Sequence, residues 1–256
     1  MVRGLDVFKK YFEAFPDNYV VIGGTACDVI IEEAGFIPRA TKDIDIILVV
    51  EALTPAFVTQ FWQFIQDGKY ERQEKSDDTR QYYRFVKPED TSFPFQVELF
   101  SRTPDTIDLQ AGAHLTPIPV DDDLSSLSAI LMDDDYYNFM IEHSTDEDGL
   151  HRANTEALIC LKAKAFLEIA ERIAAGSTED KKQLKKHKAD VFRLAVMMQE
   201  GEVHELPAPI KEKLQAFMAT AAEELPDKEI FKVMGLGNIV VKNIYERLLS
   251  AFQLEG

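Results

Sequence analysis

Positive charge is scarce in this sequence. Its 256 residues include 28 Lys and Arg against 45 Asp and Glu, which gives a formal net charge of −17. Unspecific binding to DNA, RNA or anionic membranes depends on a basic surface, so the deficit argues against all three. Cysteine is scarcer still, with only Cys27 and Cys160. Neither has a Cys or His neighbour at metal-ligand spacing, and both lie in apolar helical patterns, so we expect buried, inert thiols.

Long apolar runs are missing as well. No run reaches the length of a transmembrane helix, and the first residues lead into a charged amphipathic stretch instead of a signal peptide. A hydrophobic share of 46% and a charged share of 29% are ordinary for a globular protein, and the length suffices for one large domain or two small ones. We therefore expect a soluble cytoplasmic protein.

Hydrophobic periodicity predicts a first half that mixes helices with strands. The expected order is helix 5–15, strand 19–22, helix 24–34, strand 43–50, helix 55–65, and strands 81–86 and 95–100. After residue 154 the pattern is helical, with helices expected over 155–174, 178–199, 209–224 and 236–252. The sequence thus predicts an α+β fold: an α/β mixed-sheet domain over residues 1–150, followed by an all-helical C-terminal domain over residues 151–256.

The segment between these halves is rich in aspartate. Two acidic triplets, 121–123 and 133–135, flank a short apolar run. Neither triplet has the ordered ligand spacing of a calcium-binding loop. We expect the last strands of the sheet here, with the triplets as solvated turn ends.

Asp43 and Asp45 are the most informative pair in the chain. They stand at i and i+2 at the start of a run of β-branched and aliphatic residues. In a strand, side chains alternate between faces, so both carboxylates would point the same way. Like charges this close raise each other's pKa unless a cation lies between them, and oxygen ligands favour Mg²⁺ or Mn²⁺. The pair is a candidate metal site, although such pairs also occur as solvated loop residues.

The residues upstream favour phosphoryl chemistry. The strand 19–22 ends at Gly23 and Gly24, and Thr25 follows at the start of a helix. Glycines let the backbone approach phosphate oxygens, while a helix N-terminus adds unpaired N–H groups and a positive dipole end. Thr25 can donate its hydroxyl to the same phosphates. A metal held by the two aspartates would bridge the phosphates and align a nucleophile.

This succession resembles the nucleotidyltransferase superfamily related to DNA polymerase β, in which a Gly-Gly or Gly-Ser turn precedes a DxD strand and a later strand supplies a third carboxylate. Within it, segments 23–26 and 39–45 look most like the branch of AbiEii-type toxins. Segments 161–165 and 186–194 are similar to two helical motifs of that branch, a lysine on one helix and an aspartate on the next. The resemblance spans residues 20 to about 200.

The resemblance implies a metal-dependent nucleotidyltransferase that moves an NMP group from an NTP to a hydroxyl or phosphate acceptor, such as a tRNA or a protein. It also implies a toxin of a toxin–antitoxin system, with a cognate antitoxin as partner. The implied cofactor is Mg²⁺ or Mn²⁺. We expect neither a membrane partner nor non-specific binding of nucleic acids, because the chain is strongly acidic.

The resemblance assigns the roles of the superfamily's site residues to the matching positions of this sequence. Asp43 and Asp45 match the metal ligands. Glu98 is expected to be the third carboxylate, a further metal ligand or the base for the attacking hydroxyl, because it points away from its apolar strand neighbours. Lys162 matches the lysine expected to contact triphosphate, and Asp190 matches the aspartate near the active site. These five form the expected catalytic set, and the expected nucleotide-binding residues are Gly23, Gly24, Thr25, Arg39 and Lys42.

Other interpretations of these residues stay open. Glu98 is also explained as a solvent-facing strand residue, and Lys162 with Asp190 as an interhelical salt bridge. The basic run 181–188 could face an RNA or a nucleotide, or form a solvated helix face. A phosphatase or a glycosyltransferase with a DxD pair fits less well, because neither explains the Gly-Gly-Thr turn. A nucleotide-binding or interaction module without catalysis is the alternative function.

Overall fold

The computed structural model describes residues 2–74, 82–103, 115–117, 128–178 and 181–254, which form two compact units. The first unit comprises Met1–Asp28 and Ala40–Ala153, and the second comprises Val29–Arg39 and Asn154–Gly256. The division therefore passes through helix α2 (Gly23–Glu33) as well as after residue 153. The sequence predicted a single boundary at residue 150, which would place residues 29–39 in the first unit.

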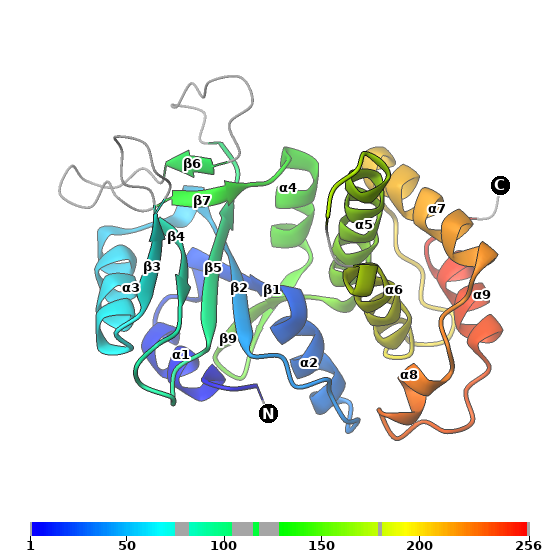
Figure 1. The fold of residues 1–256 in the computed structure, drawn as a ribbon, viewed down its shortest axis with the longest axis horizontal. Helices are drawn as coiled ribbons and strands as arrows, with labels where there is room; N and C mark the ends of the chain where they lie inside the picture. The colour runs from blue at the N-terminus through cyan, green and yellow to red at the C-terminus, as the bar shows by residue number, and fades with distance from the viewer. Residues whose placement is uncertain (1, 75–81, 104–114, 118–127, 179–180, 255–256) are drawn as a thin grey trace. The chain divides into compact units, whose positions relative to one another are not determined.

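The first unit is built on a mixed β-sheet. Its central path runs β3-β4-β5-β2-β1-β9-β8, and a further strand pair, β6 with β7, joins it at β5 (Figure 1). β2 lies antiparallel to β1 and parallel to β5, while β4 and β5 are antiparallel. The strands in chain order are β1 (Tyr19–Ile22), β2 (Asp43–Leu48), β3 (Glu71–Glu74), β4 (Tyr82–Val86), β5 (Gln96–Ser101), β6 (Leu115–Pro117), β7 (Ser128–Leu131), β8 (Ser144–Glu147) and β9 (Leu150–Ala153).

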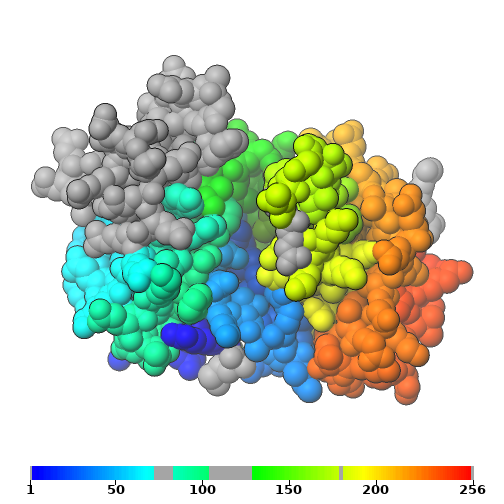
Figure 2. All heavy atoms as spheres, viewed as in Figure 1, coloured from blue at the N-terminus to red at the C-terminus, as the bar shows by residue number. Residues whose placement is uncertain are grey.

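Helices α1 (Leu5–Phe12) and α3 (Pro55–Asp67) pack an aromatic core onto one face of this sheet. The ring of Tyr19 on β1 lies 5.4 Å from that of Phe8 and 6.4 Å from that of Phe57. Thr54 caps α3, since its hydroxyl accepts the N–H of Phe57. The other side of α3 is polar and exposed, and it forms part of the surface drawn in cyan in Figure 2.

Two short 3₁₀ turns and one helix complete the first unit. The turns are η1 (Pro16–Asn18) and η2 (Val50–Ala52), and the helix is α4 (Asp134–Glu142). We expected the triplet 133–135 to be a solvated turn end. Its residues are exposed, but they begin a helix instead of ending a turn. The side chain of Asp133 accepts the N–H of Tyr136 as an N-cap, and the next two aspartates occupy the first helical turn, where the helix dipole favours negative charge. The triplet 121–123 lies outside the described residues.

The second unit is helical in its described residues. Its helices are α5 (Thr155–Ala174), α6 (Lys181–Ala195), α7 (Ala208–Glu223), α8 (Glu229–Lys232) and α9 (Val241–Ala251), together with the end of α2. α5 packs along both α6 and α7, with the rings of Phe166 and Phe217 5.3 Å apart (Figure 1). The bounds of α5 are those predicted. The α+β fold class, a mixed-sheet part followed by a helical part, is confirmed.

Each helix of the described residues is too short or too polar to cross a membrane.

Candidate functional site

The strand registers place a row of charged residues across the sheet of the first unit. Arg84 on β4 pairs with Glu98 on β5, Glu98 pairs with Asp45 on β2, and Asp45 pairs with Ile22 on β1. Paired residues of neighbouring strands point to the same face, with Cα atoms about 5 Å apart. Asp43 shares this face because it lies two residues from Asp45.

The neighbouring row points into the aromatic core. Phe85 pairs with Val97, and Val97 pairs with Ile44. The ring of Phe85 lies 5.4 Å from that of Phe61 on α3. Since side chains alternate along each strand, the charged row occupies the face opposite to α1 and α3. The alternation that predicted one shared face for Asp43 and Asp45 therefore agrees with the structure.

Asp43 and Asp45 suit a metal ion by their position and chemistry. Both are partly exposed, whereas Ile44 and Ile46 between and beyond them are fully buried. Their Cα atoms are about 6.6 Å apart in a strand, so both carboxylates can reach one ion. In the described residues, no group of three or more His, Cys, Asp or Glu side chains is arranged to hold a metal. A magnesium ion here would take its other ligands from water and substrate phosphates, as Mg²⁺ commonly does.

Gly23 is the first residue of α2 and follows β1 directly, and glycine is suited to this position for two reasons. Its φ of +71° is unfavourable for a residue with a side chain, and a Cβ atom here would lie 2.0 Å from Oδ2 of Asp45. The carboxylate of Asp45 is therefore packed against the first residue of α2. The helix N-terminus carries partial positive charge, which favours an anion at this position. Gly23 and Gly24 are the first two residues of α2, so the helix begins one residue earlier than predicted. Their contact with phosphate stays a prediction.

Two buried polar side chains of α2 form hydrogen bonds to the backbone at and just before the start of β2. The hydroxyl of Thr25 donates to the carbonyl oxygen of Asp43 at 2.5 Å. Asp28, one turn later, accepts the N–H of Thr41 at 2.6 Å. Both side chains are almost completely buried. Thr25 thus has a positioning contact, while its predicted contact with phosphate remains untested. Asp28 was missed, and its only sequence signal was an acidic residue within an apolar helical pattern.

Glu98 has a basic partner that was not predicted. Oε1 of Glu98 accepts the Nε–H of Arg84 at 2.7 Å and also contacts Nη2 of the same guanidinium. The Glu98 side chain is 11% exposed and that of Arg84 is 36% exposed. The carboxylate predicted to be a third metal ligand is therefore neutralised by an ion pair. Strand alternation in 81–86 could have indicated Arg84, because it places that residue opposite to the apolar Phe85.

Lys42 lies immediately before β2. Its side chain is exposed, and its carbonyl oxygen accepts the N–H of Phe95 at 3.0 Å. Its predicted role in nucleotide binding is neither supported nor opposed by these contacts.

The remaining predicted residues meet within the second unit. Nζ of Lys162 on α5 lies 3.6 Å from Oδ2 of Asp190 on α6, and Nη2 of Arg39 lies 3.5 Å from the same oxygen. Nη1 of Arg193, which was not predicted, lies 3.3 Å from Oδ1. Lys162 and Asp190 are buried. Three basic side chains thus lie around one buried carboxylate.

His187 borders this group of charges. Burial lowers its pKa to about 4, and the positive charge of Lys162 acts in the same direction while Asp190 opposes it. The imidazole is therefore neutral at pH 7 and adds no charge. Elsewhere in the basic run Lys181, Lys182 and Lys185 are exposed, which is compatible with both interpretations of the run. Lys188 donates to the carbonyl oxygen of Glu224.

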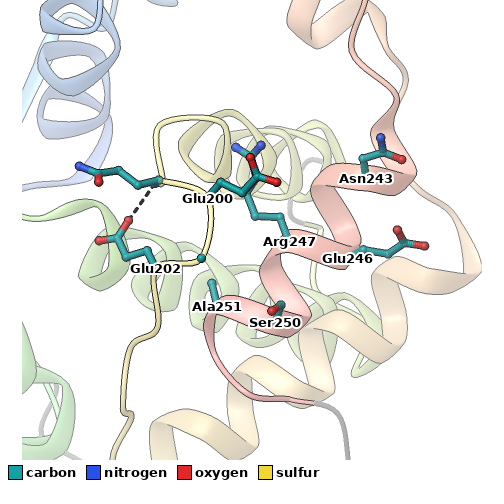
Figure 3. Close-up of a pocket in the computed structure, with 9 residues that line it drawn as sticks. Glu200, Glu202, Asn243, Glu246, Arg247, Ser250 and Ala251 are labelled. Carbon is teal, nitrogen blue, oxygen red and sulfur yellow. Dashed lines mark hydrogen bonds between the residues drawn. The ribbon is translucent and has the colours of Figure 1, made fainter.

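A separate pocket of about 390 Å³ lies in the second unit (Figure 3). It contains none of the predicted site residues. Glu200, Glu202 and Glu246 line it with a single basic residue, Arg247, which also donates to the carbonyl oxygen of Met198 at 3.3 Å. This excess of carboxylates would repel phosphates, so we do not place a nucleotide here.

Comparisons with known proteins give little guidance. No family model matches the chain, and no curated protein matches it. Among solved structures it is similar to the Megavirus polyadenylate synthase, with 10% sequence identity and a TM-score of 0.37. The match covers 86% of this chain and 36% of the synthase, so the chain spans little more than a third of that protein. A similarity this low does not define a family.

Proposed function

We propose that this protein is a metal-dependent nucleotidyltransferase that moves an NMP group from an NTP to an acceptor hydroxyl or phosphate. One observation carries the proposal: Asp43 and Asp45 share one face of β2, directly beside the glycine turn that opens α2. A carboxylate pair for a cation and a helix N-terminus for an anion are thus adjacent, which a nucleotide with its bound metal requires.

In this proposal the acceptor oxygen forms a bond to the α-phosphorus, and the bond from that phosphorus to the oxygen between the α- and β-phosphates breaks. Pyrophosphate leaves, and a hydroxyl acceptor releases its proton to water. Asp43 and Asp45 would hold Mg²⁺ or Mn²⁺, which draws charge from the phosphates when bound. The N–H groups at Gly23 and Gly24 would bind phosphate oxygens. Thr25 keeps α2 fixed relative to Asp43 through its hydrogen bond, so that these groups stay aligned.

For the second unit we propose the roles that the resemblance implies. Lys162 would contact the triphosphate, and Asp190 would hold the Lys162 side chain in position through the 3.6 Å ion pair. Arg39, which shares Asp190, would add a second cation for the nucleotide. The presence of three basic side chains around Asp190 supports this assignment.

The finer proposal is a toxin of the AbiEii type, with a tRNA or a protein as acceptor and a cognate antitoxin as partner. The motifs around Asp43, Lys162 and Asp190 support it. Because the net charge is −17, an RNA acceptor would be selected by specific contacts and not by general attraction to phosphates.

Divalent-metal-dependent NTP binding tests the proposed site. The double variant Asp43→Asn, Asp45→Asn keeps the shape of both side chains and removes both charges. We expect it to stay folded and to lose at least about tenfold in Mg²⁺-dependent NTP affinity, as measured by calorimetry. Glu13→Gln with Asp17→Asn removes the same charge from exposed positions of the first unit and serves as the control. Unchanged affinity in the Asp43, Asp45 variant would refute the site.

A nucleotide-binding module without catalysis is the second candidate. The ion pair that holds Glu98 favours it, because the carboxylate predicted to act as a base is engaged by Arg84. Incubation with labelled NTPs, Mg²⁺ and total RNA and protein decides between the two. If label is transferred to an acceptor, the hypothesis of a binding module without catalysis is excluded. If the protein binds NTP but transfers label to no acceptor, that hypothesis is favoured.

A further inference from the structure

We propose that Ser144 and His151 form a second reactive site, in which the hydroxyl of Ser144 takes an acyl group from a carboxylic ester and His151 accepts the hydroxyl proton. Ser144 begins β8 and His151 lies on β9, whereas Asp43 and Asp45 lie on β2. The inference goes beyond the proposed nucleotidyl transfer and does not depend on it.

The contact between the two side chains is the first argument. Oγ of Ser144 lies 2.8 Å from Nε2 of His151, which is hydrogen-bond distance. Ser144 and Asp146 are two residues apart on β8, and Asp146 is the register partner of His151 on β9, so all three side chains share one face of this strand pair. Ser144 and His151 are both partly exposed, which leaves them accessible to a small molecule.

The contact at the other ring nitrogen is the second argument. Nδ1 of His151 lies 2.5 Å from the carbonyl oxygen of Pro16. Because a carbonyl oxygen can only accept, Nδ1 carries a hydrogen, and in the neutral imidazole Nε2 therefore has the free lone pair. A hydroxyl beside the basic nitrogen of a histidine, with a third group that orients the ring, is the arrangement of an activated nucleophile.

The hydroxyl hydrogen of Ser144 has two acceptors within reach. The carbonyl oxygen of Ile141, near the end of α4, lies 2.7 Å from Oγ, and Nε2 of His151 lies 2.8 Å from it. A hydroxyl has one hydrogen and can donate it to only one of them at a time. The contact with Ile141 holds the oxygen in place, and rotation about the C–O bond directs the hydrogen to Nε2 when the oxygen attacks.

The surroundings of Ser144 favour an uncharged substrate. Ser144 follows the C-terminal end of α4, which carries partial negative charge, and the carboxylate of Asp146 on the same face is exposed. Both repel an anion such as a phosphate, whereas a carboxylic ester is neutral. The site therefore suits acyl transfer and not phosphoryl transfer.

The acyl transfer forms a bond between Oγ of Ser144 and the carbonyl carbon of the ester, and it breaks the bond from that carbon to the alcohol oxygen. Nε2 of His151 accepts the hydroxyl proton and returns it to the leaving alcohol. The products are the acylated Ser144 and the free alcohol. Between the two proton transfers, the imidazolium keeps its bond to the carbonyl oxygen of Pro16 and shares a face with the carboxylate of Asp146.

Acetylation by p-nitrophenyl acetate tests the inference in the wild-type protein. Mass spectrometry of its peptides should locate an acetyl group on Ser144, formed at least about tenfold faster than on the exposed Ser92, which serves as the internal control. If Ser144 is not acetylated, or is acetylated no faster than Ser92, the inference is overturned.

His151→Gln tests the role of the base. The amide cannot accept the proton, so we expect acetylation of Ser144 to be at least about 100-fold slower, and free imidazole should restore it in His151→Ala, which would not happen if the histidine were merely structural. His143→Gln, next to Ser144 in the chain, is the matched control and should react like the wild type. An unchanged rate in His151→Gln, or an equal loss in the control, would overturn the inference. If a variant fails to fold, the comparison of Ser144 with Ser92 in the wild type still decides.

Discussion

Gly23 and Asp45 show how single residues determine the site. Glycine is needed at position 23 both for its positive φ and because the Asp45 carboxylate occupies the space of a side chain. The sequence predicted the turn from its glycines, but the contact with Asp45 depends on strand pairing and could not be seen locally. Arg84 was missed for the same reason, since its partner Glu98 lies 14 residues away on the next strand.

Gly23→Ala tests this double requirement. The new Cβ would force the Asp45 carboxylate to move, in addition to straining the backbone, so we expect a loss of about 2–3 kcal/mol in the free energy of unfolding and a loss of Mn²⁺ binding. Gly35→Ala is the matched control, because Gly35 also has a positive φ, +81°, but no atom within 4 Å of the added Cβ. Urea unfolding compares them. Equal effects of the two substitutions would contradict the proposed contact.

The lowered pKa of His187 leads us to predict that the free energy of unfolding depends on pH. Its pKa is lowered from 6.5 to about 4 in the folded protein, mainly by burial and then by Lys162, with Lys186 and Arg39 adding to the effect and Asp190 opposing it. The unfolded chain therefore binds the proton more tightly, and stability falls as the pH drops from about 6.5 to 4. The expected contribution is at most about 3 kcal/mol. Urea unfolding at pH 7 and pH 4.5 should show a smaller difference for His187→Gln, and an equal difference would contradict the assignment.

At the scale of elements, local signals predicted the long helices and the alternating strands. α5 was predicted to the residue because helical apolar spacing, Asn154 before it and Gly176 after it all agree. β8, with the sequence Ser-Thr-Asp-Glu, has no apolar alternation, and it exists because it pairs with β9. α4 was missed although its signal was present, since Asp133 stands at an N-cap position before an apolar stretch.

The connection between α2 and β2 gives a prediction at this scale. Thr25→Val keeps the buried shape but removes the hydroxyl that bonds the Asp43 carbonyl. We expect a loss of about 1–2 kcal/mol in the free energy of unfolding, because a buried polar group is left without this partner. Thr25→Ser keeps the hydroxyl and should restore most of the stability. If Val and Ser are equally destabilising in chemical denaturation, the hydrogen bond does not fasten α2 to β2.

At the scale of the whole molecule, each of the two units contains a group of charged residues of its own. The first unit places Asp43, Asp45 and Glu98 on one sheet face, and the second gathers three basic residues around Asp190. The sequence predicted the α+β class and most members of both groups. The Lys162–Asp190 ion pair was one of the interpretations that the sequence left open. The pairing of Arg84 with Glu98 was not predicted, because a sheet register depends on residues far apart in the chain.

The position of the label in the NTP tests the central claim, nucleotidyl transfer, most directly. Parallel incubations would contain Mg²⁺, total RNA and protein, and NTPs labelled in either the α- or the γ-phosphate. The account predicts that the α-label becomes bound to an acceptor while the γ-label leaves as pyrophosphate, and that Asp43→Asn with Asp45→Asn abolishes both. Transfer of the γ-label, or no transfer of either label to any acceptor, would contradict it.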